Sequence, residues 1–162
     1  PPAPPSRAIT ESMFGPYSAV KGYLLKTAEV ASDRVYAFKP TPEVRSFGQI
    51  LAHVADANYM FCGVASGEAG PTTSAEQTQT TKAGIQSALA ESFAYCDRAF
   101  SGVNDVVGAE AAVIDPINNM PTTKLGVLGF ATAHQFEHYG NLVTYMRLNK
   151  MVPPSSAPAA GM

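Results

Sequence analysis

Apolar side chains recur at three- and four-residue intervals along four stretches of the chain, about 8–37, 46–66, 81–101 and 123–149. This spacing places them on one face of an α-helix, so we predict a helix for each stretch. No comparably convincing pattern for a sheet is present. Four amphipathic helices bury their apolar faces most economically against one another. The pattern therefore predicts an all-α protein, a four-helix bundle.

Short motifs mark where several of these helices begin and end. Ser46 followed three residues later by Gln49 forms a capping box, which predicts the start of the second helix. Gly67 is the expected C-cap of the same helix. Pro16 lies within the first predicted helix and is expected to kink or break its early turns, because proline lacks the N–H that the helix needs.

The remaining segments are polar or rich in helix-breaking residues. The stretch 67–80 contains many Gly, Pro, Thr and Ser residues and is predicted to be a long connector. The stretch 103–121 is predicted to be irregular, with residues 103–107 and 111–114 as short extended pieces. The proline-rich ends, 1–7 and 153–162, are expected to be a disordered arm and a disordered tail.

Composition narrows the range of functions. The 162 residues fit one domain, which we place at 8–152, and a hydrophobic fraction of 46% is enough for one core. The net charge is −2, with no cluster of Lys and Arg, so no surface for nucleic acid or anionic membranes is indicated. No apolar run approaches the roughly 18 residues of a membrane span.

All three histidines of the chain fall at inward positions of predicted helices. His134 and His138 are four residues apart, which puts both rings on one helix face. His53 shares a helix face with apolar neighbours. Three separate core histidines are the alternative, but each would need its own hydrogen-bond partners, whereas one metal satisfies all three. We therefore predict a divalent metal site, with Zn²⁺ or Ni²⁺ as the first choices and Fe²⁺ or Cu²⁺ as alternatives.

Three protein ligands leave at least one coordination position open, which favours chemistry or small-molecule binding over a purely structural role. A metal in such a site acidifies a bound water or a substrate thiol. Gln49, Asp56 and Asn141 are helical neighbours of the histidines and are candidates to hydrogen-bond to them. Their alternative interpretation is surface or interhelical hydrogen bonding. No catalytic residue can be named from the sequence.

One competing motif overlaps the histidine pair. Residues 134–138 fit H-x-x-E-H, the pattern of an inverted zinc-protease motif, with Glu137 as the base. The motif is short, Glu is common in helices, and the chain is small for a peptide cleft. A solvated helix position is the preferred interpretation of Glu137, and a zinc protease stays the lesser alternative.

The segments around the histidines resemble those of DinB-like (DinB/YfiT) proteins. Residues 134–154, HQFEHYGNLVTYMRLNKMVPP, are similar to the last helix of that family, and residues 46–59, SFGQILAHVADANY, to its second helix. The resemblance implies a four-helix bundle of up-down-down-up topology, often dimeric, with a metal site at His53, His134 and His138. Members of known activity include bacillithiol S-transferases and mycothiol-dependent maleylpyruvate isomerases. No thiol-cofactor motif is matched in this chain.

The implied topology bears on the two cysteines, Cys62 and Cys96. The second helix spans roughly 30 Å, and the connector 67–80 reaches roughly 45 Å when extended. The connector can therefore return along the bundle and start the third helix parallel to the second. Both cysteines then lie near the C-terminal ends of parallel helices, where a disulfide is feasible; two buried thiols are the alternative.

Together these features predict a small metalloprotein, a thiol S-transferase-like or hydrolase-like enzyme whose partner is a small molecule such as a thiol. A homodimer is an expected assembly. The alternative is a non-catalytic, exported protein that binds a metal or ligand. A disulfide and a proline-rich start without Met would suit an exported or periplasmic chain, with the cytoplasm as the alternative.

Overall fold

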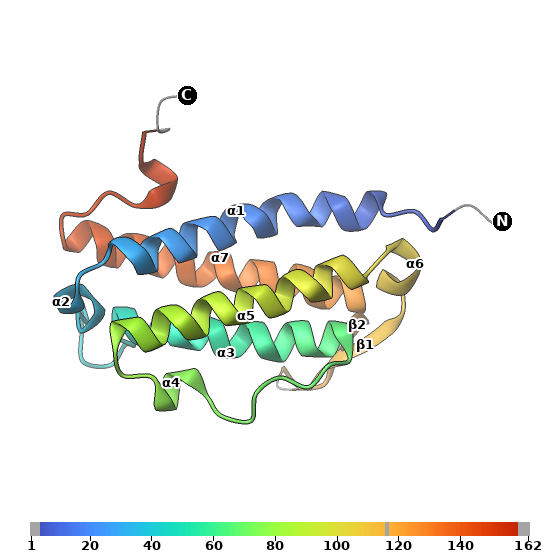
Figure 1. The fold of residues 1–162 in the computed structure, drawn as a ribbon, viewed down its shortest axis with the longest axis horizontal. Helices are drawn as coiled ribbons and strands as arrows, with labels where there is room; N and C mark the ends of the chain where they lie inside the picture. Colours follow the sequence, from blue (N-terminus) through green and yellow to red (C-terminus); the bar gives the residue numbers. More distant parts are fainter. Residues whose placement is uncertain (1–3, 116, 159–162) are drawn as a thin grey trace.

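The computed structural model describes residues 4–115 and 117–158, and four long helices packed side by side dominate it (Figure 1). They are α1 (Ala8–Val30), α3 (Phe47–Ser66), α5 (Lys82–Gly102) and α7 (Lys124–Leu148). The prediction of an all-α four-helix bundle is confirmed. None of the helices in residues 4–115 and 117–158 combines the length and the hydropathy that a membrane span requires.

The four long helices run in the order up, down, down, up. In Figure 1, α1 and α7 run one way, while α3 and α5 both run the opposite way. The connector between α3 and α5 returns along the bundle and contains one helical turn, α4 (Ala75–Thr78). Helix α3 packs against both α5 and α7, and α1 packs against the same two helices on the other side. This arrangement sets the middle of α7 against the first half of α3.

The core is the apolar face that the periodicity predicts. On α1 it consists of Tyr17, Val20 and Leu24, each completely buried. The ring of Tyr17 stacks on that of Phe100 from α5, with ring centroids 4.2 Å apart. Aromatic stacking of this kind adds to the burial of the two rings. The apolar faces of the four helices therefore meet along one continuous core.

The ends of α3 follow the predicted signals. The Ser46 hydroxyl accepts from the Gln49 N–H, and the Gln49 side chain accepts from the Ser46 N–H, so the capping box is formed. Gly67 ends the helix in a left-handed conformation with φ of 77°, which glycine adopts without steric cost. These two signals fix the start and the end of the helix that carries His53.

The prediction of one helix over 8–37 is wrong at its C-terminal end. The structure divides this stretch at Ala31 into α1 and the short α2 (Asp33–Tyr36). Side chains from elsewhere satisfy the carbonyls at the end of α1. Lys82 donates to the carbonyl of Ala31 at 2.7 Å, and Gln86 donates to that of Ala28. A helix can end where such donors replace the missing backbone bonds. The sequence near the end of α1 does not indicate these distant donors.

Pro16 does not break α1, which continues through it. The proline lies on the exposed face of the helix. Ser12, whose carbonyl loses its backbone partner, is exposed too, so water can replace the missing N–H.

The segment 103–121 is more regular than predicted. The extended piece expected at 103–107 is wrong, because a helical turn, α6 (Asp105–Gly108), begins there. Asn104 caps its first N–H groups. The segment continues into an antiparallel hairpin of β1 (Ala111–Ile114) and β2 (Met120–Thr123). The extended piece at 111–114 is thus present, and Ile114 buries its side chain completely. Residue 116 lies outside the described residues.

Parts of the arm and tail predicted to be disordered, 1–7 and 153–162, contact the bundle in the structure. The Ser6 hydroxyl donates to Asp105 at 2.6 Å, which holds the arm from that residue onward. The tail forms a 3₁₀ turn, η1 (Pro154–Ser156), beside the bundle, where the Tyr139 hydroxyl bonds to the Ser155 side chain at 2.8 Å. These hydrogen bonds tie Ser6 and Ser155 to the bundle. Residues 1–3 and 159–162 lie outside the described residues.

Parallel packing of α3 and α5 brings the two cysteines together. The structure joins Cys62 and Cys96 in a disulfide, with their Cα atoms 5.3 Å apart, and both residues are fully buried. The crosslink fastens the two parallel helices near their C-terminal ends.

Candidate metal centre

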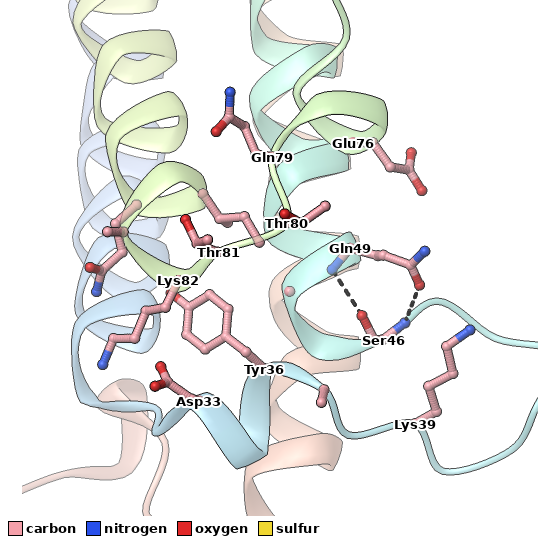
Figure 2. Close-up of a pocket in the computed structure, with 15 residues that line it drawn as sticks. Asp33, Tyr36, Lys39, Ser46, Gln49, Glu76, Gln79, Thr80, Thr81 and Lys82 are labelled. Carbon is pink, nitrogen blue, oxygen red and sulfur yellow. Dashed lines mark hydrogen bonds between the residues drawn. The ribbon is translucent and has the colours of Figure 1, made fainter.

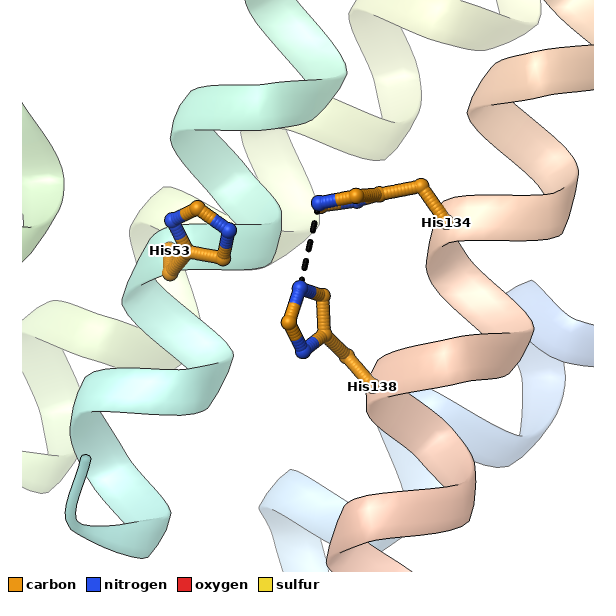
Figure 3. A group of neighbouring side chains, drawn as sticks. All are labelled: His53, His134 and His138. Carbon is orange, nitrogen blue, oxygen red and sulfur yellow. Dashed lines mark hydrogen bonds between the residues drawn. The ribbon is translucent and has the colours of Figure 1, made fainter. Parts of the chain in front are cut away.

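The three histidines converge between α3 and α7 (Figure 3). His134 and His138 follow one another by one turn of α7, and their Nε2 atoms are 3.1 Å apart. The ring of His53, from α3, has its centroid 5.2 Å from that of His134 and 4.8 Å from that of His138. One ligand atom from each residue lies within 4.8 Å of the others. The cluster that the sequence predicts is therefore present.

Packing of the two helices explains why the histidines meet. Val54 and Ala57 of α3 are buried, and so are Ala131 and Leu142 of α7. These residues hold the helices in a fixed rotation about their axes. His53 and His138 lie on the sides that face each other, so burial of apolar neighbours places the imidazoles without any contribution from a metal.

The spacing of His134 and His138 fits a divalent transition metal. Two nitrogens bound to one metal at ~2.0–2.1 Å, with a tetrahedral or a right angle between them, lie roughly 2.9–3.4 Å apart. The 3.1 Å separation in the His134–His138 pair falls in this range. The donor set consists of three imidazoles, which suit Zn²⁺, Ni²⁺, Fe²⁺ or Cu²⁺ better than Mg²⁺ or Ca²⁺.

The site keeps its imidazoles neutral. Burial is the largest cause that lowers the pKa of all three histidines, and for His134 it combines with the nearby His138 to lower the pKa to about 4. The positive Arg45 is the next cause for His53, and His53 is the next cause for His138. A histidine must be neutral to ligate a metal. The surroundings therefore favour the metal-binding form at neutral pH.

These shifts predict how the metal-free protein responds to acid. The folded-state pKa values lie below the ordinary value of about 6.5, so the unfolded chain binds protons that the folded chain does not. We expect the free energy of unfolding to fall as the pH drops from about 6.5 towards 4, the folded pKa of His134. Urea unfolding of metal-free protein at several pH values measures this slope. An equal slope after replacing all three histidines by Gln would contradict the assignment.

A carboxylate that the sequence analysis missed faces this cluster. Glu76, on α4, has an oxygen 3.4 Å from Nδ1 of His53. The opposite side of the same carboxylate receives the Arg45 guanidinium, whose Nε lies 2.8 Å away. Glu76 lies in the connector, outside any helix that carries a histidine, so no periodic signal links it to His53.

The three predicted neighbours of the histidines have other roles or no contact. The carboxylate of Asp56 accepts from the Ser74 hydroxyl and from the backbone N–H groups of Ala75 and Glu76, so it caps α4. Gln49 uses its side chain in the capping box of α3. Asn141 is exposed on α7. For Asp56 and Gln49, the alternative of hydrogen bonding within and between helices is the one that the structure shows.

A pocket of about 470 Å³ lies beside the histidines. Its walls come from α3, from His134 of α7 and from the connector residues 70–74. They are lined by His53, Asp56, Ala57, Tyr59, Met60, Gly70, Pro71, Thr72, Thr73, Ser74 and His134. Glu137 is exposed and is not among these residues. The two histidines on the wall give a small molecule in this pocket access to the cluster.

A second cavity, of about 860 Å³, lies at the N-terminal ends of α3 and α5 (Figure 2). Polar side chains surround it, among them Asp33, Lys39, Gln79 and Lys82. Glu76 lines this cavity too, while its carboxylate contacts His53. None of the three histidines lines the second cavity, so we assign the chemistry of the site to the smaller pocket.

Comparisons with known proteins agree with this fold. Residues 17–142 match the model of the DinB superfamily. No curated protein sequence matches the chain. The crystal structure of a DinB-like protein from Bacillus cereus superposes with a TM-score of 0.77 at 15% identity, covering 89% of this chain and 95% of that one.

Two further solved structures carry descriptions of an activity. YfiT from Bacillus subtilis, described as a probable metal-dependent hydrolase with an unusual four-helix bundle topology, has a TM-score of 0.68 and 15% identity over 93% of each chain. A mutant of a mycothiol-dependent maleylpyruvate isomerase has a TM-score of 0.66 and 10% identity, covering 85% of this chain and 65% of that one. At these identities the likeness shows a shared fold.

Proposed function

The chain belongs to the DinB superfamily, and from its fold and its histidine cluster we propose that it is a metal-dependent enzyme that hydrolyses a small molecule. His53, His134 and His138 would hold one divalent transition metal, with Zn²⁺ or Ni²⁺ as the first choices. The observation that carries the proposal is the convergence of three neutral imidazoles beside a pocket of about 470 Å³.

The chemistry follows from the number of ligands. Three protein donors leave a coordination position for a water or a substrate atom, and a bound metal lowers the pKa of such a water towards neutrality. His53 and His134 line the pocket, so they would hold the metal where a substrate can reach it. Tyr59 and Met60 offer the substrate an apolar surface, while Thr72 and Thr73 offer hydroxyl groups.

The size of the pocket favours hydrolysis over thiol transfer. A volume of about 470 Å³ lies in the lower part of the range for sites that hold one drug-sized ligand. A transfer reaction would need room for a thiol cofactor as well as its acceptor. Thiol transfer is the second candidate, because a structure of the same fold is described as mycothiol-dependent.

A panel of small neutral esters, amides and lactones, assayed with metal-loaded protein and with the His134→Ala/His138→Ala variant, tests the proposal. Turnover by the wild type alone supports hydrolysis. A parallel assay with a small thiol and an electrophilic aromatic halide tests the second candidate. Metal-loaded protein without turnover in either assay would overturn the enzymatic proposal and favour a binding protein.

Glu137 supplies a prediction that separates this proposal from a zinc protease. Because its side chain is exposed and does not line the pocket, we expect Glu137→Gln to leave hydrolytic activity and metal content within about twofold of wild type, the range of an exposed substitution. Steady-state kinetics of the two proteins provide the measurement. A loss of more than about 100-fold, the contribution of a general base, would instead support the H-x-x-E-H interpretation.

A further inference from the structure

The turn α4 (Ala75–Thr78) sits in the middle of the connector, and Asp56 fastens it to α3 (Phe47–Ser66). The Asp56 carboxylate accepts from the Ser74 hydroxyl at 2.6 Å and from the N–H groups of Ala75 and Glu76 at 2.6 and 3.1 Å. Asp56 follows His53 by three residues, so the two side chains lie on neighbouring positions of one helix face. The same face of α3 therefore carries a histidine of the cluster and the anchor of α4.

Anchoring of α4 sets the position of the Glu76 carboxylate. One oxygen of Glu76 lies 2.8 Å from Nε of Arg45, and the other lies 3.4 Å from Nδ1 of His53. The backbone carbonyl of Arg45 in turn accepts from the Tyr145 hydroxyl of α7 at 3.0 Å. Glu76 is thus held by the Asp56 carboxylate that caps α4 and by Arg45. Arg45 in turn is hydrogen-bonded to α7, the helix that carries the other two histidines.

The contact with Glu76 bears on which nitrogen of His53 carries the proton. A neutral imidazole has one N–H and one free lone pair. A carboxylate at Nδ1 favours the N–H on that atom, which leaves the lone pair on Nε2. The opposite side of the His53 ring faces His134 and His138 (Figure 3).

We propose that Glu76 is a positioning residue that fixes the tautomer and orientation of His53 for metal binding, and that Asp56 and Arg45 hold Glu76 in place. The proposal rests on the metal site proposed above. Carboxylates that hold the second nitrogen of a metal-bound histidine typically contribute about 10- to 100-fold to metal affinity. The connector, which is remote from the histidines in sequence, thereby becomes part of the site.

The test compares Glu76→Ala, Glu76→Gln and Asp56→Ala with a matched control, Glu68→Gln. Glu68 is an exposed acidic residue of the same connector and pairs loosely with Arg98 at 3.9 Å. Competition titration with Zn²⁺ gives the dissociation constant of each variant. Nitrogen-15 NMR of the imidazoles in metal-free protein near pH 7.5 gives the tautomer of His53.

We expect Glu76→Ala to weaken Zn²⁺ binding about 10- to 100-fold and to lower the Nδ1–H fraction of His53. Asp56→Ala should change both readouts in the same direction although Glu76 is intact. Glu76→Gln should lose less Zn²⁺ affinity, since an amide oxygen can also accept from an Nδ1–H. Glu68→Gln should match wild type. Unchanged affinity and tautomer in Glu76→Ala would overturn the proposal. Glu76 and Arg45 would then form only a surface ion pair.

The two readouts separate this inference from the metal site itself. If the wild type binds no Zn²⁺, the metal site fails, and the tautomer measurement on metal-free protein still decides whether Glu76 orients His53. If the wild type binds Zn²⁺ and Glu76→Ala matches it in both readouts, only the positioning role fails. Circular dichroism of each variant verifies that the helices are retained.

Discussion

Replacing His134 and His138 together by alanine is expected to reduce the bound metal from about one ion per chain to background, because a single remaining imidazole cannot hold a divalent ion tightly. His53→Ala alone should weaken binding by more than about 100-fold, since loss of a ligand exceeds the 10- to 100-fold effect of losing a partner of a ligand. Elemental analysis of protein loaded with Zn²⁺ or Ni²⁺ and then desalted provides the measurement.

The fold should survive these substitutions. His53 and His134 are only half-buried, although His138 is buried. Apolar neighbours such as Val54 and Leu142 hold the helices together. Glu137→Gln is the matched control, because it lies between the two histidines of α7 but is exposed. Metal content that is equal in the double variant and the control would show that the ion binds elsewhere.

Removal of the disulfide is expected to produce the largest loss of stability. Cys62 and Cys96 close a loop with a sequence separation of 34 residues, for which the loss of chain entropy in the unfolded state corresponds to roughly 3–4 kcal/mol. The free energy of unfolding of a Cys62→Ala/Cys96→Ala variant should be lower by about this amount, out of the roughly 5–15 kcal/mol that is typical of a folded domain. Urea unfolding monitored by circular dichroism tests this, and metal content should be unchanged.

Thiol titration supplies an independent check on the same bond. The unfolded protein should show no reactive thiols before reduction and two after it. Two reactive thiols before reduction, together with an unfolding midpoint equal to that of the double variant, would contradict the crosslink. Because disulfides persist in oxidising compartments, we also propose an exported location for this chain.

Much of this architecture is contained in local sequence. The spacing of Tyr17, Val20 and Leu24 predicts the buried face of α1, and the Ser46–Gln49 capping box predicts where α3 starts. The histidine cluster is predictable for the same reason, since periodicity on two helices determines which side chains face inward. Choosing the up-down-down-up topology needed more than periodicity, and the resemblance to DinB-like proteins supplied it.

The remaining features depend on contacts between distant segments. The end of α1 at Val30 relies on donors from Lys82 and Gln86, about 50 residues further along the chain. The role of Asp56 depends on the path of the connector, which places Ser74 beside its carboxylate. Glu76 could not be predicted to contact His53, because no local pattern fixes the path of a connector across the bundle.

The central claim is that His53, His134 and His138 hold one divalent metal. Anomalous diffraction from crystals grown with Zn²⁺, recorded on either side of the zinc absorption edge, tests it most directly. The account predicts one strong peak among the three imidazoles, within about 2.0–2.1 Å of one nitrogen of each ring. A peak held by other residues, or no peak among these histidines at saturating Zn²⁺, would contradict the account.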